Sequence, residues 1–371
     1  ALRAECEAEG RTFQYDRHCL GLTQQEVDTR LQAGEPYVIR QKMPREGSTT
    51  FHDAVYGDIT VENTELEDQI LIKSDGFPTY NFANVVDDHL MAITHVVRGS
   101  EYLSSAPKYN LLYEAFGWEV PTYVHLPLIV KPDGSKISKR KGDATFEDLL
   151  NEGYLVEAIV NYLALLGWSP ESNQEIFSLS ELEKVFSINR ISKSPSVFDM
   201  VKLRWFNAEY LRAMTPEAFH DVALPWIKKG LTTDLPTLPI ARMIQPRTEV
   251  LSEIPEKLSF LNNLGDYDLQ IFVHKKMKTT LENSLESLLA AVPVLEGIQD
   301  WNEETIHASI MDLIAKMGIK NGQMLWPIRT AVSGWEVTPG GAIEIVEILG
   351  KDETLRRIRI GIERLKAATA G

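Results

Sequence analysis

The stretch that decides the fold is MAITHVVRGSEYLSSAPKYNLLYEAFGWEVPTYVHLPLIV, residues 91–130. Residues 93–97 form a short apolar run of the kind that makes a buried strand. A helix is expected next, because Pro107 suits a first helical turn and Gly117 suits the position after a last turn. The apolar segment 124–130 predicts a second strand. Strand, helix and strand in this order predict two parallel strands joined by a right-handed crossover.

The residues before this unit predict a mixture of short elements. A helix is expected in residues 22–34, where Thr23 and Glu26 have the spacing of a capping box. A strand is expected in residues 36–44. Residues 69–82 predict a strand, a turn at an Asp-Gly pair and a further extended piece.

The residues after position 144 change in character and predict helices. Ser178 and Glu181 have capping-box spacing. From position 215 onward nearly the whole sequence has helical periodicity. The proline-rich segment 235–246 is expected to be a joint between two helical groups.

The composition limits the classes of function. The 371 residues carry 53 acidic and 38 basic side chains, a net charge of -15, which argues against a protein that coats nucleic acid non-specifically. Two cysteines cannot build a disulfide framework, so a reducing compartment is expected. No apolar run has the roughly 20 residues of a membrane-spanning helix.

One loop departs from the acidic balance. Residues 131–143, KPDGSKISKRKGD, carry five basic side chains and two acidic ones. Two lysines three positions apart, Lys136 and Lys139, could hold a triphosphate and stabilise the charge that develops as pyrophosphate leaves. A solvated basic loop or a localisation signal explains the same residues. The charge pattern alone favours neither interpretation.

Two further segments could carry chemistry. Arg98 follows the first strand, and ligands of parallel sheets bind beyond the carboxyl ends of strands. Its guanidinium fits a carboxylate, and Tyr80 could add a hydroxyl group; a surface ion pair is the alternative for Arg98. Residues 84–90, NVVDDHL, hold Asp and His side chains, but a capped turn with a satisfied histidine is preferred over a metal site. Neither common nucleotide-binding glycine loop is present.

Longer stretches carry a resemblance to a known family. KISKR, residues 136–140, resembles the Lys-Met-Ser-Lys-Ser loop of class I aminoacyl-tRNA synthetases. Residues 75–118, 125–143 and 153–170 closely resemble glutamyl-tRNA synthetase of the bacterial and organellar type. WPIRTAVSGWEVTPGGAIEIVEILGKDETLRRIRIGIERL, residues 326–365, resembles the anticodon-binding end of that family.

The resemblance implies a fold of α/β plus all-α class. A partial Rossmann-like parallel sheet of the nucleotide-binding domain would carry an acceptor-stem insertion, and a stem-contact region and a helical anticodon-binding domain would follow. The implied domains are the remainder of the acceptor-stem insertion, the second half of the catalytic domain, the KISKR loop with the stem-contact helices, and the anticodon-binding domain: residues 1–75, 76–130, 131–214 and 215–371.

The resemblance also implies the site residues. The phosphate loop would hold the catalytic residues Lys136, Ser138, Lys139 and Arg140. The glutamate side would be Tyr80, Asn84 and Arg98. The ATP side would be Glu101, Tyr102, Leu126, Leu128, Ile129, Lys136 and Lys139. The tRNA would be bound by Lys320, Arg329, Arg356, Arg357 and Arg359. On charge alone, a solvent face covered by salt bridges is an equal alternative for the last helix of the chain, which holds the last three of these residues. No protein metal site is expected, because Mg²⁺ would arrive with ATP.

The implied function is glutamate–tRNA ligation with glutamate, ATP and tRNA(Glu) as partners, by a monomer without a membrane, in a mitochondrial matrix or a bacterial-type cytoplasm. The family's opening strand and its His-Ile-Gly-His segment have no counterpart in these residues. We therefore expect that this chain alone does not activate glutamate. Two alternatives are a non-enzymatic tRNA-binding fragment and a non-discriminating ligase that also charges the glutamine tRNA.

Overall fold

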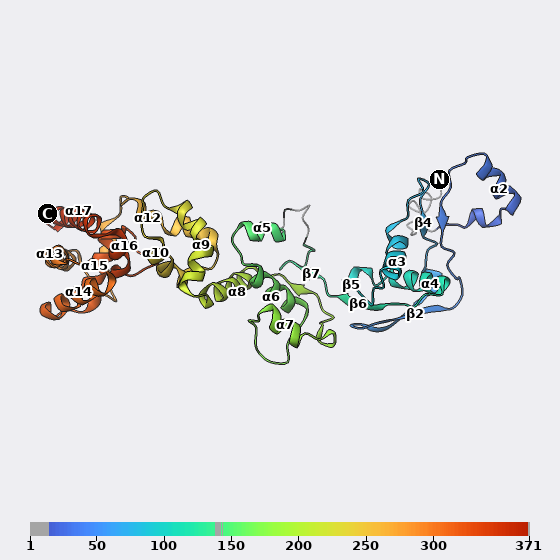
Figure 1. Cartoon of the computed structure of the whole chain (residues 1–371), viewed down its shortest axis with the longest axis horizontal. Helices are drawn as coiled ribbons and strands as arrows, with labels where there is room; N and C mark the ends of the chain where they lie inside the picture. The colour runs from blue at the N-terminus through green and yellow to red at the C-terminus, as the bar shows by residue number, and fades with distance from the viewer. Residues whose placement is uncertain (1–14, 138–141, 143, 370–371) are drawn as a thin grey trace. The chain divides into compact units, whose positions relative to one another are not determined.

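The computed structural model describes residues 15–137, 142 and 144–369. The chain divides into two compact units, which are described separately: Ala1–Ser138 with Leu163–Phe198, and Lys139–Tyr162 with Asp199–Gly371. The first unit contains a sheet with helices, and the second is helical (Figure 1).

The first unit is built on a four-stranded sheet in the order β3-β2-β6-β5. Its strands are β2 Ser48–Asp53, β3 Gly57–Glu62, β5 His95–Gly99 and β6 Thr122–Leu126. β5 and β6 are parallel, as the sequence predicts, and α4 (Ala106–Phe116) connects them. β2 and β3 form an antiparallel hairpin, and β2 joins β6 in parallel through the pair Asp53 and Tyr123.

The expectation for residues 79–82 was wrong. The chain does not stay extended there, because α3 (Tyr80–Leu90) begins at Tyr80. The segment 84–90 therefore lies inside a helix and not in a turn, and its histidine, His89, stacks on Trp118 with ring centres 3.9 Å apart. α3 packs on α4 through a buried cluster of Val85, Tyr109, Leu112 and Tyr113. This packing fixes the face of α3 that turns toward the sheet.

The remaining elements of the first unit are short. α2 (Gln24–Gln32) has the predicted capping box between Thr23 and Glu26. The strand expected in residues 36–44 is only β1 (Ile39–Arg40), which pairs with β4 (Ile70–Ile72). The others are η1 His18–Gly21, η2 Asn63–Glu65, η3 Ser100–Tyr102, β7 Ile129–Val130, α7 Leu179–Val185, η5 Ile188–Arg190 and β8 Ser196–Val197. α6 (Val156–Gly167) contains the boundary between the two units.

The second unit packs helices around one large apolar core. Its helices are α5 Phe146–Asn151, α8 Met200–Ala213, α9 Pro216–Gly230, α10 Thr237–Ile244, η6 Gln245–Arg247, η7 Leu251–Glu253, α11 Ile254–Lys257, α12 Ser259–Asn262, η8 Leu269–Phe272, α13 Leu281–Gly297, α14 Glu303–Met317, α15 Asn321–Ser333, α16 Ala342–Leu349 and α17 Lys351–Thr369. The joint expected in residues 235–246 is instead α10, whose residues Ile240, Ala241, Met243 and Ile244 are buried in that core.

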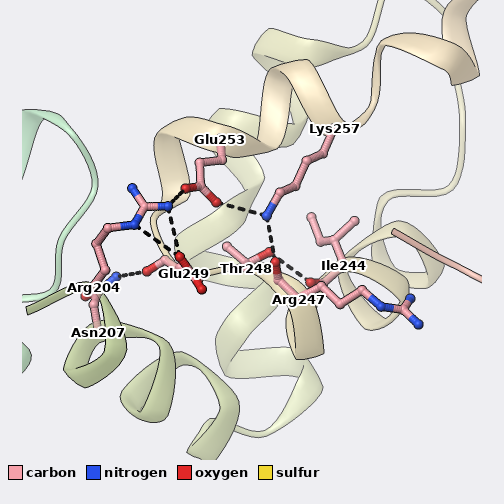
Figure 2. A network of polar contacts seen from close by, with 8 residues as sticks. All are labelled: Arg204, Asn207, Ile244, Arg247, Thr248, Glu249, Glu253 and Lys257. Carbon is pink, nitrogen blue, oxygen red and sulfur yellow. Dashed lines mark hydrogen bonds and ion pairs between the residues drawn. The ribbon is translucent and has the colours of Figure 1, made fainter. Parts of the chain in front are cut away.

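A polar network fixes the segment between α10 and α11 (Figure 2). Arg204 of α8 pairs with Glu249 and Glu253, and Lys257 donates to Glu253 Oε2 at 2.9 Å. Lys257 also donates to the backbone carbonyl of Arg247 at 2.6 Å. Figure 2 shows the Arg247 guanidinium directed away from these carboxylates. The network therefore fixes the backbone of Arg247, and the Arg247 guanidinium takes no part in it.

Candidate functional site

Arg98 lies at the carboxyl end of β5, and one of its N–H donor groups has no hydrogen-bond partner among the described residues. Its side chain is 12% exposed, and its Nη2 lies 4.0 Å from Asp88 Oδ2, beyond hydrogen-bond distance. Its guanidinium carbon lies 5.0 Å from the ring centre of Tyr109 and 5.4 Å from that of Tyr102. Nη1 is buried and has no hydrogen-bond partner among the described residues. Such a guanidinium can still form a charged hydrogen bond to a ligand.

Other buried polar atoms around Arg98 are also unpartnered. Asn84 lies one turn before Asp88 on α3, and neither atom of its side-chain amide has a partner with hydrogen-bond geometry among the described residues. The amide does lie near the Tyr109 hydroxyl, where it opposes the rise that burial causes in the pKa of Tyr109. The hydroxyl groups of Tyr113 and Tyr123 are unpartnered as well. Buried polar groups in proteins are nearly always hydrogen-bonded. A polar ligand that accepts from Arg98 and pairs with Asn84 would satisfy these groups.

The electrostatics around Arg98 suit a negative ligand. Burial raises the pKa of Tyr113 to about 12, with a further rise from Asp88 and an opposing effect from Arg98. Burial likewise raises the pKa of Tyr123, so both hydroxyl groups stay neutral near pH 7. Burial also raises the pKa of Asp88, against the opposing charge of Arg98. Arg98 therefore faces Asp88 at 4.0 Å without a hydrogen bond, and its Nη1 remains available to a negative ligand.

The third residue expected on the glutamate side lies at the rim. Tyr80 begins α3, and its side chain is 59% exposed. Its ring centre lies 6.0 Å from that of Tyr102. The structure thus brings Tyr80, Asn84 and Arg98 to one region, with Arg98 and Asn84 inside and Tyr80 outside.

The residues expected on the ATP side gather at the same edge of the sheet. Leu126 ends β6 and is paired with Gly99, which ends β5; Glu101 and Tyr102 follow in η3, and Leu128 and Ile129 follow β6. A side chain on Gly99 would clash, because its Cβ would lie 2.1 Å from Glu101 Oε2. The absence of a side chain at Gly99 therefore lets the Glu101 carboxylate lie against the end of β5.

Only the first part of the phosphate loop can be placed. Lys136 forms an isolated antiparallel bridge with Val130 after a turn in which Gly134 has a φ of +80°. The other expected residues of this loop, Ser138, Lys139 and Arg140, lie outside the described residues.

No local pattern in the sequence predicts the buried pair beneath this edge of the sheet. Asp53 Oδ2 lies 2.6 Å from His125 Nδ1, and both side chains are at most 1% exposed. Asp53 also accepts from the backbone N–H groups of Val55 and Tyr56 at 2.9 and 2.8 Å. The pair joins residues 72 positions apart and ties β2 to the residue just before Leu126. It anchors the strand that carries the expected ATP-side residues.

The second unit carries a pair of neighbouring arginines. Arg329 of α15 lies 4.2 Å from the ring centre of Trp326 and donates to Thr338 Oγ1 at 3.2 Å and to the Glu336 carbonyl at 2.6 Å. Burial lowers the pKa of Arg329, the positive charge of Arg247 lowers it further, and Glu336 opposes the shift. The positive charge of Arg247 therefore acts on Arg329, and a region of like positive charge favours an anion such as a phosphate. Sequence reasoning missed Arg247, because 82 positions separate it from Arg329.

The other residues expected to bind tRNA lie in different surroundings. Lys320 is exposed before α15. Arg356 and Arg359 of α17 are exposed and pair with Glu353 and Glu296. These three side chains place positive charge on the surface of the second unit. The carboxylates of Glu353 and Glu296 already compensate the charges of Arg356 and Arg359.

Arg357 requires a correction. Its side chain is fully buried, and its guanidinium donates to the backbone carbonyls of Phe260, Val332 and Leu261 at 2.7, 2.8 and 3.1 Å. It also pairs with Glu353 at 2.6 Å. Arg357 therefore holds α17 against α12 and α15, and it has no surface to offer to an RNA.

Two absences hold for the part of the chain that the structure describes. None of its helices combines the length and the apolar character that a membrane-spanning segment needs. No three His, Cys, Asp or Glu side chains in it come together as metal ligands.

Comparisons with known proteins match two consecutive parts of the chain. A family model described as tRNA synthetases class I (E and Q), catalytic domain, matches residues 1–205, and one described as an anticodon binding domain matches residues 193–362. The glutamate–tRNA ligase of Clostridium botulinum strain Hall is 59% identical over 366 residues, which cover 99% of this chain and 76% of that protein. The ligase of Clostridium tetani is 59% identical over 98% of this chain and 75% of its own length.

Solved structures give the same result. A glutamate tRNA ligase from Elizabethkingia meningosepticum, in complex with its amino acid, has a TM-score of 0.86 at 33% identity and covers 98% of this chain and 77% of its own. The glutamate–tRNA synthetase of Elizabethkingia anophelis has a TM-score of 0.84 at 34% identity, with the same coverage. With a match to the class I catalytic domain followed by a match to a helical anticodon-binding domain, this chain belongs to the glutamate–tRNA ligase family of class I aminoacyl-tRNA synthetases.

Proposed function

We propose that this chain serves the ATP-dependent attachment of glutamate to tRNA(Glu). The observation that carries the proposal is the buried pair of unpartnered groups, Arg98 Nη1 and the Asn84 amide, at the carboxyl end of β5. A guanidinium and a neutral amide suit the side-chain carboxylate of glutamate, which is the amino acid named for the chain's relatives.

The reaction has two steps. An oxygen of the α-carboxylate of glutamate attacks the α-phosphorus of ATP, and pyrophosphate leaves as glutamyl-adenylate forms. A ribose hydroxyl at the 3′ end of the tRNA then attacks the acyl carbon, and AMP leaves. Arg98 and Asn84 would hold the glutamate side chain, and the end of β6 would lie along ATP. Lys136, with the lysine and arginine residues that follow it, would stabilise the charge on the leaving pyrophosphate. Mg²⁺ would enter as part of the ATP complex.

The surroundings of Arg98 also give a reason why the chain would bind glutamate rather than glutamine. A carboxylate gains a charged hydrogen bond from Arg98, whereas a neutral amide leaves the half-buried guanidinium with Asp88 at 4.0 Å as its counter-charge. We therefore propose selection of glutamate as amino acid. The choice of tRNA would belong to the helical unit, where Lys320, Arg329, Arg356 and Arg359 remain proposed contacts and Arg247 is added to them.

A chimera tests the proposal without the influence of chain length. Residues 1–371 replace the matching residues of the Clostridium botulinum ligase, and labelled glutamate is offered with tRNA(Glu) and with tRNA(Gln). Charging of tRNA(Glu) at a rate near that of the parent ligase is expected. Equal charging of both tRNAs would support the non-discriminating alternative. A folded chimera that binds tRNA without charging it would favour the alternative of a tRNA-binding protein.

Two finer expectations also become proposals. The relatives described above are bacterial, so we propose a bacterial-type setting; they give the mitochondrial alternative no support. We also propose that the chain acts as a monomer, and a single peak at 41.9 kDa in light scattering is the expected result.

A further inference from the structure

A loop in the helical unit displays three lysines that have no acidic partner. The lysine loop, residues 273–280, connects η8 to α13 and contains Lys275, Lys276 and Lys278. All three are exposed, and none forms an ion pair with a described residue. Three unpaired cations on so short a segment are unusual in a chain with a net charge of -15. Ion pairs with acidic side chains therefore do not account for the presence of these three lysines.

The lysine loop has a defined shape. Thr279 Oγ1 donates to the Phe272 carbonyl at 2.7 Å and accepts from the His274 N–H at 3.0 Å. Lys278 has a φ of +59°, in the left-handed region, and its carbonyl accepts from Asn283 Nδ2 at 3.0 Å. A strained residue held by specific hydrogen bonds indicates that the turn is built by its surroundings. The lysines therefore project from a fixed backbone, which lowers the entropy lost when they bind.

The lysine loop packs on α15, the helix that carries Arg329. The ring of His274 lies 4.0 Å from that of Trp326, whose Nε1 donates to the Ile271 carbonyl at 2.9 Å. Gly322 lies directly under the loop, because a Cβ there would be 2.7 Å from Met277 Sδ. Since Trp326 also contacts Arg329, the loop and the arginine share one aromatic side chain. The lysine loop thus packs on the same helix that carries Arg329.

We propose that the lysine loop binds the sugar–phosphate backbone of the tRNA held by the helical unit. The proposal rests on the proposed function, since it names a second contact region for the same partner. Lysine is a compact charge on a flexible stem and matches phosphate groups without reading bases. The loop would therefore add affinity for every tRNA, whereas the arginine pair would contribute to the choice among them.

The salt dependence of tRNA binding by the 371-residue chain tests this. The variant K275Q/K276Q/K278Q is compared with the wild type by equilibrium binding to tRNA(Glu) between 50 and 200 mM NaCl. Each lost phosphate contact lowers the slope of log K against log salt by about 0.9, so binding changes about 3.5-fold less over this range per contact. We expect the slope to fall by about 2, with equal weakening for tRNA(Glu) and a non-cognate tRNA.

Two controls separate charge from structure. Replacement of the same three lysines by arginine keeps the charge and should restore the slope. K316Q removes a lysine whose ammonium group is already paired with Asp312 at 2.5 Å, and it should leave the slope unchanged. If the triple glutamine variant does not fold, each single variant is measured, with an expected decrease of up to about 0.9.

The outcomes distinguish the two proposals. An unchanged slope with selective binding of tRNA(Glu) would overturn the role of the lysine loop and leave the proposed function in place. Absence of selective binding by the wild-type chain would count against the proposed function. A variant that keeps its tRNA slope but loses binding to an acidic polypeptide such as polyglutamate would show that the loop serves a protein partner instead.

Discussion

Replacement of Arg357 by methionine should remove a central tie of the helical unit. The guanidinium joins three helices, because α17 carries it, Phe260 and Leu261 lie in α12, and Val332 lies in α15. Methionine fills most of the volume but leaves three carbonyl groups without a donor.

The magnitude follows from these contacts. Each buried carbonyl left unsatisfied costs about 1–3 kcal/mol, so three carbonyl groups near the low end of this range cost about 3–5 kcal/mol. Glu353 is 31% exposed and keeps its two hydrogen bonds to Arg356, so loss of its pair with Arg357 adds little to this cost. We predict a loss of about 3–5 kcal/mol for Arg357→Met and about 2 kcal/mol for Arg357→Lys, which keeps the charge. A loss of this size is a large share of an ordinary domain's stability.

Urea unfolding followed by far-ultraviolet circular dichroism measures the effect. Arg359→Met is the matched control, because Arg359 is exposed on the same helix and its pair with Glu296 should contribute less than about 1 kcal/mol. A loss below about 1 kcal/mol for Arg357→Met would refute the reasoning, since it would show that the buried guanidinium does not carry these hydrogen bonds.

Three further predictions concern stability. Gly153→Ala should destabilise the helical unit by about 2 kcal/mol in urea unfolding, because Gly153 has a φ of +88° and an added Cβ would lie 2.6 Å from Leu251 Cβ; an unchanged midpoint would contradict this. Asp53→Asn should lower the thermal midpoint, because it weakens the buried contact to His125; an equal or higher midpoint would show that the charge is not needed. Hydrogen bonds from the neighbouring arginine side chains lower the pKa of Glu353 to about 2, so its stabilisation should be complete above its ordinary value of 4.5 and be lost as pH falls toward 2; Glu353→Gln should flatten that part of the profile.

Local signals predicted the elements that local chemistry controls. The capping boxes at Thr23 and Ser178 formed as expected, and Gly117 ends α4 with a φ of 67°. The parallel pair of strands also follows from the order of the elements. The segment 235–246 misled the prediction, because Pro236 and Pro239 stand at and near the start of α10 and Pro246 follows its end, so that none interrupts the helix.

Long-range packing decided the parts that could not be predicted. The charge pattern of α17 shows several arginines but not which of them turns inward, so buried Arg357 was grouped with exposed Arg356 and Arg359. The Asp53 and His125 pair depends on the contact between two strands far apart in sequence. The role of each basic side chain therefore depended on its partners in the folded chain.

The central claim is that Arg98 selects glutamate, and glutamate-dependent ATP–pyrophosphate exchange tests it most directly. In the chimera with the Clostridium botulinum ligase, measured with tRNA(Glu) present, Arg98→Gln should lower kcat/KM for glutamate about 150-fold, equivalent to about 3 kcal/mol. Lys184→Gln, a change at an exposed residue of α7, should leave it unchanged. An Arg98→Gln chimera that keeps the parental KM and rate for glutamate would contradict the account.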